Sequence, residues 1–408
     1  MVTAIYINKL ITVGLIFVIM LNLVFAGCVT EDDKDENGED GESFQAEIIL
    51  KRTFSLDTTA AIDYTLHLPL PEDKIIDDVT VQKVVSVESD PKYTVDNSRS
   101  QPHMLWEDHL DGGKSQDFQI EYHIKTNEMV WDISHETSGT VGDIPIVIHD
   151  GNDKNQFLTD AWPVEDYNDD PGIDSDGDGI DDERDVDDNN DGVVDKYRIE
   201  PSNPEIQDLL DVILNWAGVS DSGPSSDLNV WRVTDAIYRY LRSSEGVTYS
   251  TSAQAQSDYL TYGSLPKWAT ACYNDGHGDC DDQSILFISL CRAAGVPAWM
   301  EFGFLYNNQK EEFGGHGWAS VFVPMANGDS KTPEVDVAGS QFFTRNMGKF
   351  SEWTDDCKPG QFGTGSEQYT WQSGSLEEHY MIWFYTYSGA TPSISTSEDI
   401  ELVKFEVE

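Results

Sequence analysis

One cysteine and one histidine in this chain stand where they could act together as a nucleophile and its base. Cys280 opens a segment with the apolar pattern of a helix, and His316 follows Gly314-Gly315 at the start of an alternating segment that is typical of a strand. A thiol in the first turn of a helix lies near unpaired backbone N–H groups, which favour its thiolate form. These residues therefore suit acyl transfer through a thioester, with Cys280 as nucleophile and His316 as base and acid.

A third residue, Asp336, could hold the imidazole in place. It lies in the next segment with a strand pattern, and pairing of the two strands would bring its carboxylate to the second imidazole nitrogen. Asp329, in the intervening turn, is the alternative carboxylate. Asp281 and Asp282 directly follow the cysteine, and because their charge partly opposes thiolate formation, a base is still needed.

The elements that must position these residues follow from the periodicity of apolar side chains. Two helical stripes are expected after residue 204: Ile206, Leu209, Leu210, Ile213 and Trp216, then Val230, Val233, Ile237, Tyr240 and Leu241. Asp279 suits the N-cap of a third helix, which Gly295 and Pro297 would end near residue 294. Strands are expected at 299–306, 318–323 and 334–337. Helices followed by strands predict an α+β core.

The segment from Gly278 to Ala298 resembles the nucleophile segment of the transglutaminase-like superfamily, in which a Gly-x-Cys opens a core helix that ends in Arg-Ala-x-Gly-(Ile/Val)-Pro-Ala. His316 and Trp318 are similar to the His and Trp of the next family signature, and Asp336 to its third member. The resemblance implies a papain-like core with a Cys280–His316–Asp336 triad.

The resemblance extends over about residues 204–345, and we predict a catalytic domain at 199–345. Gly317 stands where the family often has Ala, and Val337-Ala338 replaces the Pro-Thr pair that commonly follows the Asp. The family's activities imply a protein or peptide substrate, whose amide is attacked through a thioester intermediate.

Residues 44–168 have a different pattern, with apolar and polar residues alternating in several segments between turn clusters. This pattern predicts an all-β sandwich domain that precedes the core and serves for spacing or substrate presentation. Residues 346–408 contain further alternating segments, and we expect strands there that pack on the core.

Residues 169–198 form an acidic segment that predicts a calcium-binding connector. The candidate ligands are Asp174, Asp176, Asp178, Asp182, Asp185, Asp187, Asn189, Asp191 and Asp195. Their spacing suits a hard cation with six to eight oxygen ligands, and it resembles thrombospondin type 3 repeats, which implies structural Ca²⁺. The alternative is a merely acidic, disordered linker.

The N-terminus predicts an extracytoplasmic protein. Lys9 precedes an apolar run at 10–26 that ends in Ala26-Gly27-Cys28, which resembles a lipoprotein signal. In that interpretation residues 1–27 are a signal peptide, Cys28 carries a lipid anchor at the cell surface, and 28–43 form an acidic tether. The alternative is an uncleaved membrane anchor. In both cases the membrane is a partner.

Composition limits the remaining partners. The chain has 408 residues and a formal net charge of −50, which repels polyanions, so we expect no nucleic-acid partner. Five cysteines are present. With Cys28 lipidated and Cys280 catalytic, we expect a Cys272–Cys357 disulfide and a buried Cys291.

The leading hypothesis is a surface-tethered cysteine-dependent acyl-transfer enzyme acting on protein or peptide amides. Hydrolysis is slightly favoured over amine transfer, because water is available outside the cell and no amine site is identified. The alternative function is a catalytically inactive, calcium-dependent adhesion or scaffolding lipoprotein.

Overall fold

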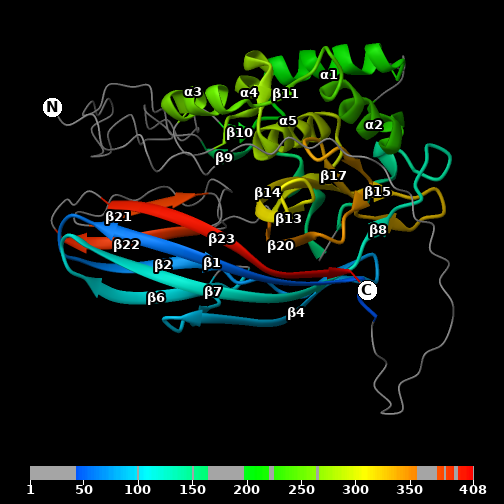
Figure 1. The fold of residues 1–408 in the computed structure, drawn as a ribbon. Coiled ribbons are helices and arrows are strands. Elements are labelled where there is room, and N and C mark those ends of the chain that lie inside the picture. The colour runs from blue at the N-terminus through cyan, green and yellow to red at the C-terminus, as the bar shows by residue number, and fades with distance from the viewer. Residues whose placement is uncertain are drawn as a thin grey trace, which may run out of the picture.

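The structure is a computed structural model that describes residues 43–98, 101–148, 151–163, 197–219, 225–262, 266–355, 375–380, 383–389 and 394–407. It confirms the predicted α+β class. In Figure 1 the helices gather on one side of a central sheet, and two further sheets lie on the other side; each of the three sheets has five strands. None of the helices in this described part of the chain is long and apolar enough to span a membrane.

The two sheets outside the central one form a β-sandwich. The first has the strand order β23-β1-β7-β4-β3, with bounds Ala46–Thr58 (β1), Lys74–Ile76 (β3), Val79–Asp90 (β4), Lys114–Thr126 (β7) and Ile394–Val407 (β23). The second has the order β21-β22-β2-β6-β5, with bounds Ile62–Pro69 (β2), Thr94–Asp96 (β5), His103–Leu110 (β6), Ser375–Tyr380 (β21) and Trp383–Gly389 (β22). Alternate residues of β1 are buried, as the period-two pattern predicts.

The predicted boundaries of the sandwich are wrong at its C-terminal side. The expected strands of 346–408 do exist, but β23 pairs with β1 along its whole length, and β22 pairs with β2. Only β20, Lys349–Thr354, joins the core sheet. The sandwich is therefore built from both ends of the chain, because its edge strands need partners that the 44–168 segment alone does not supply.

The segment between the sandwich and the helices belongs to the core and not to the sandwich. Trp131, Ile144, Phe157 and Trp162 are buried in one cluster with the helices. Short elements here and nearby are β8 Met129–Val130 with β19 Thr344–Arg345, β9 Ala161–Pro163 with β10 Tyr197–Ile199, β15 Val323–Pro324 with β16 Ser330–Lys331, and the 3-10 turns Val141–Asp143, Lys154–Phe157 and Ser225–Asp227. The N-terminal part of the sandwich thus ends near residue 126, and its remaining strands come from the C-terminal part of the chain.

The central sheet has the order β18-β17-β14-β13-β20. Its strands are Ala298–Asn307 (β13), Glu312–Val321 (β14), Glu334–Asp336 (β17), Gln341–Phe342 (β18) and β20. The helices are Pro204–Ala217 (α1), Val230–Leu241 (α2), Ser252–Tyr262 (α3), Ala269–Asp275 (α4) and Cys280–Ala293 (α5). Thr248–Tyr249 (β11) and His277–Gly278 (β12) form a short parallel pair beside α5.

Two expectations about individual side chains in the core are wrong. Trp216 was expected in the buried stripe of α1, but it is 45% exposed with Arg239 over its ring, and Leu214 is buried instead. Cys272 is a free cysteine buried on α4, so the predicted disulfide with Cys357 does not form; Cys357 itself lies outside the described residues. Cys291 is buried and free, as expected.

The sandwich and the central sheet are joined by buried polar contacts. The Nη1 atom of Arg52, on β1, lies 3.1 Å from Oε1 of Glu352 on β20, and both side chains are almost fully buried. Gln82, on β4, donates to the carbonyl of Ser351 at 2.8 Å and accepts from its backbone N–H at 2.7 Å. Phe304 and Phe350 from the central sheet lie in the apolar core of the sandwich. The two parts therefore share one packed interface.

The buried Arg52–Glu352 pair predicts a large stability effect on substitution. R52A should lower the free energy of unfolding by about 3–5 kcal/mol, because it leaves the buried Glu352 carboxylate without its cation. Urea denaturation followed by tryptophan fluorescence would measure the change.

A neighbouring exposed pair provides the matched control. Lys51 lies 3.7 Å from Glu121 and both side chains are about half exposed, so K51A should cost no more than about 1 kcal/mol. The double variant R52M/E352M should recover much of the loss. Equal effects of R52A and K51A would show that the buried pair does not join the two parts.

Candidate active site

Cys280 lies at the N-terminus of α5, as its capping residues predict. Asp279 is the N-cap, and its carboxylate and that of Asp282 each accept a backbone N–H of the other residue. The predicted C-terminal signal is also present, since Gly295 adopts a positive φ of 83° just after the helix. The helix end thus fixes where the thiol points.

His316 lies in the middle of β14, not at its start. The hairpin of β13 and β14 is in register from Ala298 opposite Val321 to Asn307 opposite Glu312, so Gly314 and Gly315 are already part of the ladder. Glycines contribute the same backbone hydrogen bonds as other residues, which is why the Gly-Gly pair does not mark the strand start.

The predicted partner of His316 is the observed one. Nε2 of His316 lies 2.6 Å from Oδ2 of Asp336, and the other oxygen of that carboxylate accepts the backbone N–H of Gly339 at 2.6 Å. Asp336 is fully buried and His316 is 8% exposed. Asp329, the alternative, lies in the turn and bonds to Asn327. With Nε2 engaged, Nδ1 is the nitrogen left to serve the thiol.

Strand β14 also brings the backbone next to the nucleophile. A hydrogen bond from the backbone of Gly317 reaches the Cys280 thiol, and Ser284 Oγ donates to the carbonyl of Cys280 at 2.7 Å. A Cβ atom on Gly317 would lie 2.5 Å from Cε of Met300, so Met300 fills the space that an alanine would take here. His316, next in the chain, is thereby held beside the start of α5.

Gly339 allows the loop after Asp336 to approach its carboxylate closely. A Cβ atom at this position would lie 2.3 Å from Oδ2 of Asp336. The loop after Asp336 therefore uses a glycine to bring its backbone N–H against the carboxylate, which a side chain would prevent.

The electrostatic surroundings of Cys280 differ from the expectation. Burial raises the pKa of the Cys280 thiol, and the charges of Asp281 and Asp279 raise it further, while the hydrogen bond from Gly317 lowers it. The thiol sulfur and one carboxylate oxygen each from Asp279 and Asp281 lie within 4.8 Å of one another. The helix end therefore does not by itself produce a thiolate, and the neutral thiol requires a base.

Two of the aspartates beside the nucleophile, Asp279 and Asp282, have raised pKa values. Burial raises the pKa of Asp282 to about 7, with the charge of Asp281 adding to the effect. Burial, followed by the charges of Asp281 and Asp282, also raises the pKa of Asp279. Partial protonation reduces the negative charge that would otherwise oppose thiolate formation.

Two groups of described residues bring metal-ligand atoms together, and we assign a metal to neither. One is Asp279, Cys280 and Asp281, where a cation would block the nucleophile. The other is Asp258, Asp275 and His277, but the Lys267 ammonium lies 3.0 Å from Asp258 and 2.9 Å from Asp275, so a cation is already provided. All the predicted calcium ligands between Asp174 and Asp195 lie outside the described residues.

Sequence reasoning missed two residues close to the triad. Tyr249 lies on β11, which pairs with Gly278 just before the nucleophile. Burial and then the charge of Cys280 raise the pKa of Tyr249, so its phenol stays a hydrogen-bond donor. Lys349, on β20, lies 3.4 Å from Asp336. Tyr249 stands far from any motif, and a lysine in a strand pattern is ordinarily taken as exposed.

The fold, together with Cys280, His316 and Asp336, places the protein in a class of thiol-dependent enzymes. Residues 193–330 match the model of the transglutaminase-like superfamily, so this part of the chain is a transglutaminase-like domain, as the motifs predict. The match contains Cys280 and His316. A search of curated proteins gave no match.

Two solved structures are similar to the chain. One is a candidate cysteine protease from Cytophaga hutchinsonii, with 12% sequence identity and a TM-score of 0.43, covering 89% of this chain and 92% of that one. The other is the periplasmic domain of TgpA from Pseudomonas aeruginosa, with 10% identity and a TM-score of 0.25, covering 71% of this chain and 86% of that one.

The raised pKa of Cys280 predicts how its reactivity depends on His316. In H316Q the thiol loses its base, so carbamidomethylation by iodoacetamide at pH 7.5 should slow at least about tenfold. Because a raised pKa keeps the thiol neutral to higher pH, the rate in H316Q should still be rising above pH 9. Peptide mass spectrometry at timed intervals would measure this rate.

Controls are available within the same chain. H277Q removes a nearby histidine that lies 3.2 Å from Asp258 and should leave the rate unchanged. The buried thiols of Cys272 and Cys291 should stay unmodified and report any unfolding. If H316Q and H277Q reacted alike, His316 would not be the base.

Proposed function

We propose that this protein is a cysteine-dependent hydrolase of protein or peptide amides that works through a thioester intermediate. The observation that carries the proposal is the buried pair of His316 and Asp336, whose side chains lie 2.6 Å apart. The residue after His316 on β14 is Gly317, and its backbone forms a hydrogen bond with the Cys280 thiol. A nucleophile, a base and a residue that orients the base are the components that acyl transfer requires.

In the first half-reaction His316 removes the proton of the Cys280 thiol as the sulfur attacks the amide carbonyl carbon. The resulting oxyanion is stabilised by backbone N–H groups at the start of α5, with the Tyr249 hydroxyl as the nearby side-chain donor. His316 then gives its proton to the leaving amine, the C–N bond breaks and a thioester remains.

In the second half-reaction an acceptor attacks the thioester. Water, deprotonated by His316, releases a carboxylic acid and restores the thiol. A primary amine in place of water would form a new amide, which is transglutamination. We favour water because it is always available outside the cell, and the described residues around Cys280 do not identify a site for an amine.

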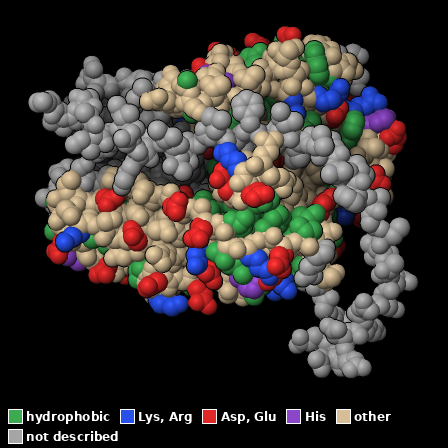
Figure 2. All heavy atoms as spheres, in the orientation of Figure 1, with side chains coloured by type: hydrophobic (Ala, Val, Ile, Leu, Met, Phe, Trp, Pro, Cys, Tyr) green, Lys and Arg blue, Asp and Glu red, His purple; other side chains and the backbone are tan. Residues whose placement is uncertain are grey.

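The same proposal includes the setting of the enzyme. The lipoprotein-like segment ending at Cys28 supports a protein that is tethered outside the cytoplasmic membrane and acts on substrates there. The acidic composition is visible as Asp and Glu side chains scattered over the face of the sandwich in Figure 2, and it suits a soluble domain held off a surface.

The acceptor can be identified directly. Protein comprising residues 43–408 would be incubated with a glutamine-rich test protein and a labelled primary amine, and products read by peptide mass. We expect deamidation or backbone cleavage that disappears in C280A, since the thioester then cannot form. Cys280-dependent incorporation of the amine would replace hydrolysis by transglutamination. Activity that persists in C280A would overturn the proposed nucleophile.

Calcium binding by the connector is a separate proposal with its own test. The carboxylate spacing from Asp174 to Asp195 supports structural Ca²⁺. Titration calorimetry should show Ca²⁺ binding that D176A/D178A weakens at least about tenfold, because two ligands are lost. E107A/D108A, which removes two exposed carboxylates from β6, is the control and should bind normally. Identical titrations for both double variants would contradict the proposal.

A further inference from the structure

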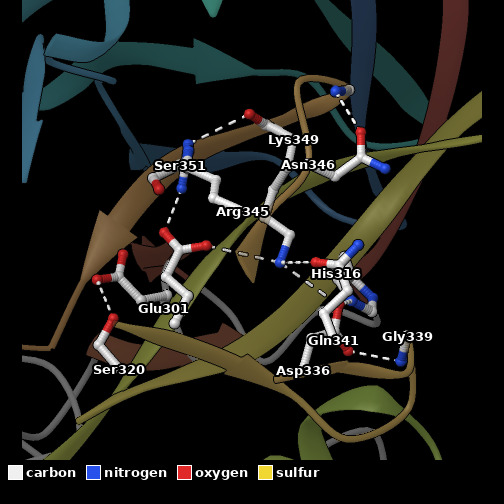
Figure 3. Close-up of polar contacts among 12 residues, drawn as sticks. Glu301, His316, Ser320, Asp336, Gly339, Gln341, Arg345, Asn346, Lys349 and Ser351 are labelled. Atoms are coloured by element: carbon white, nitrogen blue, oxygen red, sulfur yellow. Dashed lines mark hydrogen bonds and ion pairs between the residues drawn. The ribbon is translucent and has the colours of Figure 1, made fainter. Parts of the chain in front are cut away.

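A group of fully buried charged residues lies directly behind the catalytic carboxylate. Glu334 and Asp336 lie on β17, Arg345 on β19 and Lys349 on β20, and each is 0% exposed. Arg345 forms an ion pair with Glu334. Figure 3 shows the Lys349 side chain pointing toward His316 and Asp336, whereas the guanidinium of Arg345 points away from them, toward Ser351. Burying four charges is unfavourable unless each meets an opposite charge.

Lys349 is the member of this group that contacts Asp336. Its ammonium lies 3.4 Å from Oδ2 of Asp336, which is the same oxygen that His316 meets at 2.6 Å. It also lies 3.2 Å from Oε1 of Gln341 and 3.6 Å from Oε2 of Glu334. The imidazole and the ammonium thus share one carboxylate oxygen.

Lys349 also reaches His316 through an aromatic ring. Its ammonium lies 4.5 Å from the centroid of the Trp318 ring, at cation–π distance. The Trp318 and His316 rings are near parallel, at 22°, with centroids 6.0 Å apart. The Lys349 ammonium therefore contacts both groups that neighbour the His316 imidazole, the Asp336 carboxylate and the Trp318 indole, and restricts their positions.

The charges in this group already balance without His316. Arg345 and Lys349 are cations, and Glu334 and Asp336 are anions. An imidazolium at His316 would be a third positive charge against two negative ones. Because the site is buried, water screens these charges little, and the balance acts strongly on the imidazole.

We propose that Lys349 is a positioning residue that holds Asp336 for His316 and offsets its charge, so that the imidazole rests as a neutral base. The inference rests on the proposed function, in which His316 removes the thiol proton. Asp336 orients the ring through Oδ2, while Lys349 limits how strongly that carboxylate stabilises an imidazolium. Burial opposes ionisation of Asp336, but its contacts with His316, Lys349 and the Gly339 backbone lower its pKa, which agrees with a permanently ionised carboxylate.

Other charged and titratable groups surround His316 and Asp336 and must stay constant in a test. They are Cys280 and Asp281 on α5, Tyr238 on α2, Arg242 directly after α2, Glu301 on β13, and Glu334, Arg345 and Lys349. The C280S background is common to all samples, and the two test variants, K349M and E334Q, each change one further member of this set.

The test compares two substitutions that should shift the pH midpoint of the His316 titration in opposite directions. In full-length C280S protein, the C2–H proton of His316 would be followed by NMR from pH 4 to pH 10, with H316Q giving the assignment. K349M should raise the pH midpoint of the imidazole titration by about one to three units, because Asp336 then acts with its full charge. E334Q should lower the midpoint, because a negative charge near Lys349 is lost.

A control variant and a measurement without substrate allow the role of Lys349 to be tested separately from the proposed function. K310M removes an exposed lysine next to β14 and should leave the midpoint unchanged. If K349M does not fold, E334Q decides alone: an unmoved or raised midpoint overturns the proposal. Equal midpoints in K349M and K310M would also overturn it. Because the titration needs no substrate, absence of amidase activity would contradict the proposed function and leave this measurement valid.

Discussion

The site depends on keeping one carboxylate ionised where no water reaches it. Asp336 is fully buried, and burial alone favours its neutral form. Three contacts offset this cost: the imidazole of His316, the backbone N–H of Gly339 and the ammonium of Lys349. A neutral carboxyl group could not orient the imidazole in the same way, so the loop after β17 and the strand β20 are required by the chemistry as well as by the fold.

This constraint gives the sandwich a role in the enzyme. Lys349 lies at the start of β20, and two later residues of this strand contact the sandwich: Ser351 bonds to Gln82, and Glu352 pairs with Arg52. Gln82 also accepts from Arg345 at 3.4 Å, within the charged group behind Asp336. The sandwich thus closes the polar side of the central sheet against water. A spacer would not need such contacts, and for this reason we regard the two parts as one functional unit.

The helix that carries Cys280 was predicted from capping residues close to it in the sequence. The features that the sequence did not predict depend on contacts between distant parts of the chain. The cap at Asp279 and the glycine at 295 act within a few residues, so the helix of Cys280 was readable from the chain. His316 and Asp336 were identified by motif and strand order. The pairing of β23 with β1 joins residues more than 300 positions apart, and nothing in either segment specifies the other. Lys349 was missed because its burial depends on partners from other strands.

Opposing effects also decide whether Cys280 rests as a thiol or as a thiolate. At the start of α5 the helix dipole favours a thiolate, but burial and the adjacent Asp279 and Asp281 act in the opposite direction and together outweigh it. A thiol that rests neutral gains nothing from an imidazole that rests protonated, because proton transfer then has no acceptor. The charge balance around Lys349 and the raised pKa of Cys280 are therefore consistent with each other: both favour a neutral thiol beside a neutral base, with the ion pair forming only as the substrate is attacked.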